Sequence, residues 1–77
     1  MFQNLSFTIK FTIDDPGFVS LELYDLLGRR VKILTEDYMK SGDYSVIFTA
    51  SDLPSGVYLY RLQAGEAMET GRMLLLK

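Results

Sequence analysis

The sequence has no cysteine, no histidine and no tryptophan. The lack of cysteine and histidine excludes disulfide frameworks, zinc sites with the usual ligands, cysteine nucleophiles and histidine-based catalytic triads. Long apolar runs are also missing, because none approaches the roughly 18–20 residues that a membrane-spanning helix needs. No block of basic residues is present, and the formal net charge of −2 argues against nucleic acid as a main partner.

The composition is that of one small folded domain. The chain has 77 residues, of which 48% are hydrophobic and 23% charged, so a packed core is expected and intrinsic disorder is not. A domain of this size buries only about 60% of the surface of its unfolded chain, so its stability is expected to be modest.

Alternation of apolar and polar residues is the dominant pattern in the chain. It predicts strands at 7–13, 19–24, 44–49 and 57–62, a shorter strand at 31–34 and a last strand within 67–76. Turn residues separate these segments, and no long stretch has the 3.6-residue period of a helix. We expect an all-β fold, namely a small immunoglobulin-like antiparallel β-sandwich of six to seven strands. A five- or six-stranded barrel is the alternative.

Glycine and proline mark the expected connections. The short turn at 14–17 suggests a hairpin between the first two strands, and Gly28 is expected at positive φ in the next turn. The pattern weakens at 35–40, which we expect to be a loop. Gly71 suggests a bulge or a break in the last strand.

The last two strands are expected to form a hairpin closed by a turn at 64–66. In the final strand Leu74 and Leu76 point to one face, and Met73 and Leu75 point to the other. A strand that is apolar on both faces has two explanations. Either a partner covers one face, or the strand is central in the sandwich and buried on both sides.

The candidate metal ligands are adjacent carboxylates. Asp14-Asp15 and Glu36-Asp37 both lie in expected turns, and turn carboxylates are suitable ligands for Ca²⁺. No spacing resembles an EF-hand loop, so we expect solvated turns and no metal or cofactor. Glycoside hydrolysis by paired carboxylates would need a cleft that raises one pKa, and so thin a domain has little room for a cleft. We therefore expect no enzyme activity.

Aromatic residues are frequent, but alternation places most of them on the core face. An aromatic platform for sugars or bases is therefore the less favoured interpretation. Tyr58 and Tyr60 share one face, where their hydroxyl groups need partners if they are buried. Arg61 lies on the opposite face, where it is expected to be solvated or to pair across strands with Glu69.

Several short motifs follow one another in a fixed order along most of the chain. They are Thr8-Ile9-Lys10-Phe11, Tyr24, Asp25, Gly28 and Arg29 with Val31, Ser41 with Gly42, and Leu53, Gly56 and Tyr58. The terminal motif is the apolar run Met73, Leu74, Leu75 and Leu76 with Lys77. In this order the motifs resemble a known family, the type A C-terminal sorting domain of the type IX (Por) secretion system.

The resemblance implies a non-catalytic sorting signal rather than an enzyme. Such a domain follows a cargo protein fused to its N-terminal side into the periplasm. There the outer-membrane type IX machinery recognises it, and in many cases a sortase removes it at the surface. The protein would then be secreted or displayed at the cell surface. We expect residues 7–77 to form the sorting domain, with the terminal residues 73–77 as the recognition site. Residues 1–6 would be a linker remnant, although they lack the proline that the family's linker usually has.

Two other functions compete with the sorting interpretation. The same motifs resemble the immunoglobulin-like domain of flagellar hook-capping proteins, which would make this a structural assembly module. A carbohydrate-binding or adhesive accessory domain is the other alternative, and it would require an exposed row of aromatic side chains. A sorting signal requires Lys77 to be the natural C-terminus, whereas an assembly module should tolerate further residues. Exposed strand edges are compatible with a homodimer or a strand swap.

Overall fold

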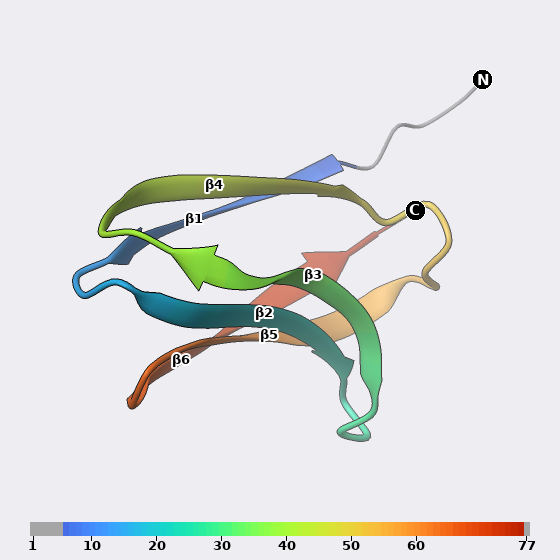
Figure 1. Cartoon of the computed structure of the whole chain (residues 1–77). Helices are drawn as coiled ribbons and strands as arrows, with labels where there is room; N and C mark the ends of the chain where they lie inside the picture. The colour runs from blue at the N-terminus through green and yellow to red at the C-terminus, as the bar shows by residue number, and fades with distance from the viewer. Residues whose placement is uncertain (1–5, 77) are drawn as a thin grey trace.

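The computed structural model describes residues 6–76, which form six strands and no helix (Figure 1). Within those residues, therefore, no helix is long and apolar enough to cross a membrane. The strands are β1 (Ser6–Ile13), β2 (Gly17–Asp25), β3 (Arg30–Met39), β4 (Gly42–Thr49), β5 (Gly56–Ala64) and β6 (Ala67–Leu75).

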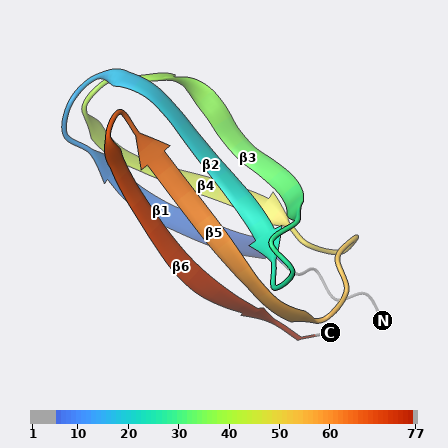
Figure 2. The same cartoon turned by 90° about the horizontal axis from the view of Figure 1, so that it is seen from below.

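The strands form two antiparallel sheets that face each other. One sheet has the order β3-β2-β5-β6, and the other contains only β1 and β4. In Figure 2, β4 lies behind the β2–β3 side of the larger sheet and β1 lies behind its β5–β6 side. The prediction of a small all-β sandwich is confirmed. The barrel alternative is wrong, because the two sheets of the described chain stay separate.

The core lies between the sheets and follows the predicted alternation. On β5, Tyr58 and Leu62 point inward and are buried, while the neighbouring Leu59 is exposed. The inward side chains form two clusters that share partly buried neighbours. They are Leu23, Phe48, Ala50, Leu53, Tyr58 and Leu75 in one cluster, and Phe11, Ile13, Val19, Leu21 and Leu62 in the other.

The predicted hairpin between the first two strands is wrong. β1 pairs with β4, β2 pairs with β3 and β5, and the segment at 14–16 crosses from one sheet to the other. The reason is that β1 and β2 both carry an apolar face. Ile13 and Val19 pack into one cluster from opposite sheets, so the apolar faces of β1 and β2 cover each other across the core.

The predicted loop at 35–40 is also wrong, because β3 continues to Met39, which pairs with Gly17. The segment is hard to recognise because Glu36, Asp37 and Tyr38 of this edge strand are all exposed, so no apolar period is visible there. Earlier in β3, two register shifts in the pairing with β2 bring Val31 and Leu34 both toward the core although they are three residues apart. Glu36 and Asp37, expected in a turn, lie exposed in this strand.

Gly71 causes no bulge or break. The pairing of β5 with β6 has no register shift, and Gly71 lies directly opposite Tyr60. A Cβ atom at residue 71 would overlap the ring of Tyr60. The glycine therefore makes room for an aromatic side chain that packs over its strand.

Candidate recognition surface

β6 is an edge strand, so the alternative that it is central and buried on both sides is wrong. The structure divides the predicted recognition residues into two groups. Leu75 is only 1% exposed, and Met73 packs against the same core cluster. Leu74 and Leu76 are 59% and 68% exposed. Lys77 lies outside the described residues.

Leu74 belongs to an apolar patch on the outer face of the larger sheet. It pairs directly with Val57 of β5, and Leu59 lies two residues further along the same face. We call Val57, Leu59 and Leu74 the outer β5–β6 patch. The side chains of this patch point away from the core, so a partner protein can contact them.

A charged network lies beside the patch, on the same outer face. The Glu22 carboxylate accepts hydrogen bonds from Arg30 Nη1 at 2.8 Å and from Arg61 Nη2 at 3.1 Å. Tyr24 donates its hydroxyl hydrogen to Glu22 and accepts a hydrogen bond from Arg61 at 2.7 Å. The Arg61 guanidinium also lies 5.0 Å from the centre of the Tyr24 ring.

This network corrects the expected partner of Arg61, which is Glu22 rather than Glu69. The hydrogen bond from Arg30 is the main cause that holds the pKa of Glu22 below its usual range, against the opposing effect of burial. Sequence reasoning missed Glu22 and Arg30. The signal was two opposite charges at outward positions, but their proximity depends on a register that the sequence does not show.

The motif residues Asp25, Gly28 and Arg29 form the turn between β2 and β3. The Asp25 carboxylate accepts hydrogen bonds from the backbone N–H of Leu27 and of Arg29, both at 2.9 Å, and from Arg29 Nε at 2.7 Å. The backbone bond from Arg29 is the main cause that lowers the pKa of Asp25. Gly28 has a φ of 83°, which confirms the prediction of positive φ. These residues shape a turn.

The other motif residues also hold the fold. Leu53 is buried in the core, and the Tyr58 hydroxyl donates to the carbonyl of Pro54 at 2.6 Å, which closes the loop before β5. This bond supplies the partner that a buried tyrosine needs. Gly56 begins β5, and Gly42 begins β4. The motif residues are thus spread over separate connections, and the structure does not gather them into one site.

The described residues hold no group of three or more aspartate, glutamate, histidine or cysteine side chains suited to a metal ion. Exposed aromatic residues form no row within residues 6–76. Phe18 and Tyr38 make one edge-to-face pair at 6.0 Å on the outer face. The outer surface of the described residues offers strand edges and exposed aliphatic side chains.

Residues 3–76 match the family described as the secretion system C-terminal sorting domain. The chain belongs to this family. Searches of curated proteins and of solved structures found no match. Membership makes this a type IX sorting domain, which is a secretion signal at the C-terminal side of a cargo protein. The cargo of such a domain is secreted or carried on the cell surface, and the secretion machinery is the partner of the sorting domain. Sorting domains of this family are generally non-catalytic, and nothing favours the hook-capping or carbohydrate-binding alternative.

Proposed function

We propose that the outer-membrane type IX machinery recognises this folded domain at β6, through the free strand edge and the exposed side chains Leu74 and Leu76. The observation that carries the proposal is the split within the terminal segment. Leu75 stabilises the sandwich from inside, while its two neighbours are exposed on the surface. A free edge offers backbone hydrogen bonds, and alternate side chains add specificity, as in other cases of strand addition.

In this proposal the domain folds in the periplasm behind its cargo, and the machinery binds β6 before the cargo crosses the outer membrane. A sortase then removes the domain from those cargo proteins that are released or anchored. The domain itself performs no chemistry in these steps.

An export assay with matched substitutions tests the proposal. A periplasm-targeted fluorescent protein is fused ahead of the chain in a bacterium with a working type IX system. We compare the original chain with the double variant Leu74→Ser/Leu76→Ser and with Ile47→Ser. Ile47 is the control, because it is also an exposed aliphatic residue, at 71%, but lies on β4 of the other sheet. Removal of 73–77 would be a poor test, because it also removes Leu75 from the core.

We expect the original chain and Ile47→Ser to carry the reporter to the surface or the medium. The double variant should leave the reporter in the periplasm, with a circular dichroism spectrum unchanged for the purified domain. If all three versions are exported equally, recognition does not depend on the side chains of Leu74 and Leu76. If the original chain also leaves its reporter in the periplasm, the sorting proposal itself is overturned.

A further inference from the structure

The sandwich is open along one side, between β1 and β6. Each of these strands is at the edge of its sheet, and they do not pair with each other (Figure 2). The space between them, which we call the seam, contains two hollows of about 310 and about 180 Å³. Its walls are therefore strand edges whose outward backbone groups have no partner in the sheets of the described chain.

One end of the seam is apolar. Phe7 and Ile9 of β1 line it from one side, Met73 of β6 lines it from the other, and Tyr60 of β5 lies between them. All four side chains are partly buried and pack against the core. Lys10 is also at this end, so a cationic group of a ligand is disfavoured here.

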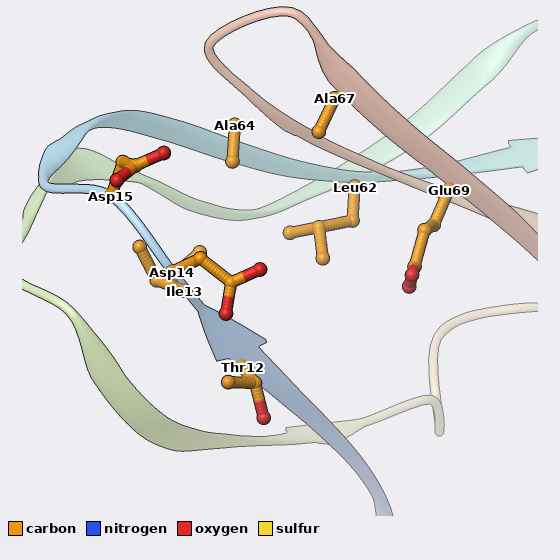
Figure 3. Close-up of a pocket in the computed structure, with 8 residues that line it drawn as sticks. All are labelled: Thr12, Ile13, Asp14, Asp15, Leu62, Ala64, Ala67 and Glu69. Atoms are coloured by element: carbon orange, nitrogen blue, oxygen red, sulfur yellow. The ribbon is translucent and has the colours of Figure 1, made fainter.

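The other end of the seam is acidic. Asp14 and Asp15, which follow β1, and Glu69 of β6 line it around Leu62 (Figure 3). None of these three carboxylates makes an ion pair or a hydrogen bond within residues 6–76. The two ends of the seam thus differ in chemistry. The end near Met73 is apolar, and the end near Glu69 is negatively charged.

We propose that the seam binds an extended segment of a partner protein, which adds as an antiparallel strand to the edge of β6 with its basic end at Glu69. The free edge specifies an extended backbone, and antiparallel pairing is the commoner geometry. The inward residues of β6 then specify side chains. Apolar residues at positions i and i+2 lie opposite Met73 and Gly71, and lysine or arginine at i+4 lies opposite Glu69. The proposal uses the same free edge of β6 as the proposed recognition by the secretion machinery, but its side-chain specificity comes from inward residues of β6 and not from the outward Leu74 and Leu76.

A binding measurement with purified domain tests this pairing. The probe is a fluorescein-labelled peptide, Thr-Val-Thr-Val-Thr-Lys-Thr, and its counterpart has glutamate in place of lysine. Affinity is measured by fluorescence anisotropy, and the contact surface is mapped by amide chemical shifts. We expect the lysine peptide to bind about three- to tenfold more tightly than the glutamate peptide, with shifts along β6 and at Phe7 and Ile9.

Charge reversal separates the seam from a general electrostatic effect. Glu69→Lys should reverse the preference between the two peptides. Thr70→Lys is the control. It places the same new side chain on a neighbouring exposed residue that points to the opposite face, and it makes the net charge more positive by one, against two for Glu69→Lys. It should leave the lysine preference largely intact. Both residues are exposed, so neither substitution is expected to disturb the fold.

Several results would overturn the proposal. One is the absence of binding at millimolar peptide. Another is an equal response of Glu69→Lys and Thr70→Lys, and a third is a set of shifts confined to the outer face. Sedimentation velocity tests whether a second copy of the domain occupies the seam. If the domain is a dimer that the peptide dissociates, a second copy fills the seam and the partner segment is refuted.

Discussion

The two faces of β6 predict opposite outcomes for neighbouring leucines. We expect Leu75→Ala to destabilise the domain strongly and Leu74→Ala to leave its stability almost unchanged. Leu75 is 1% exposed and packs with the buried cluster around Leu23 and Tyr58, whereas Leu74 is 59% exposed. The two leucine-to-alanine substitutions, one residue apart, therefore compare a buried side chain with an exposed one.

The magnitude follows from the burial of each side chain. Truncation of a buried leucine to alanine costs about 2–5 kcal/mol, and an edge strand that relaxes into the cavity favours the lower half of that range. A chain of 77 residues is expected to have a free energy of unfolding of about 4–12 kcal/mol. Leu75→Ala would thus remove a large part of the total and lower Tm by at least about 8 °C. Leu74→Ala should stay within about 0.5 kcal/mol.

Urea denaturation followed by far-ultraviolet circular dichroism is the appropriate assay, since the chain has no tryptophan. The midpoint should fall for Leu75→Ala without a change in the slope of free energy against urea. Equal destabilisation by the two substitutions would refute the reasoning, because it would mean that the outer face of β6 is covered. Stability close to that of the original chain in Leu75→Ala would likewise show that this strand is not part of the core.

Three further predictions concern other contacts. Gly71→Ala should destabilise the domain by about 1–3 kcal/mol, because the added methyl group meets the Tyr60 ring, while Gly17→Ala, which meets nothing within 4 Å, should be close to neutral in the same urea assay. Tyr58→Phe should cost about 0.5–1.5 kcal/mol through loss of the hydrogen bond to Pro54, and a loss no larger than that of the exposed control Tyr38→Phe would contradict this. Stability should fall as the pH drops below the usual glutamate range, because the pKa of Glu22 is lower in the folded than in the unfolded chain. Measurements at about pH 7 and about pH 3 should show a smaller fall for Glu22→Gln, and an identical fall would remove Glu22 from the explanation.

Alternation was a reliable guide where a strand stays regular and has one buried face. It correctly assigned the inward face of β5 and the two faces of the terminal segment, because in a strand these depend only on sequence parity. It failed in β3, where Val31 and Leu34 both reach the core through register shifts. Such shifts are set by the neighbouring strand, and a single strand carries no local sign of them.

The pairing of strands that are distant in the sequence was also not predicted correctly. The turn at 14–17 has the residues of a hairpin, yet it joins two sheets, because burial of both apolar faces outweighs the local turn preference. The partner of Arg61 was missed for a related reason, since Glu22 comes next to it only through the pairing of β2 with β5. The sequence assigned Leu74 and Leu76 to the same face of the terminal segment, where both are exposed, but the edge position of β6 required the strand order.

The position of Leu75 also determines at what stage of synthesis the domain can fold and be recognised by the secretion machinery. β1 pairs with β4, and Leu75 fills the cluster that contains Leu23 and Phe48, so segments from the whole sequence meet in one core. Such non-local contacts form only after the intervening chain is available. A cargo whose synthesis stops before β6 would carry neither a completed core nor the strand edge that we propose is recognised. The sorting signal can therefore form only after β6 has been synthesised, and truncated proteins would not be exported.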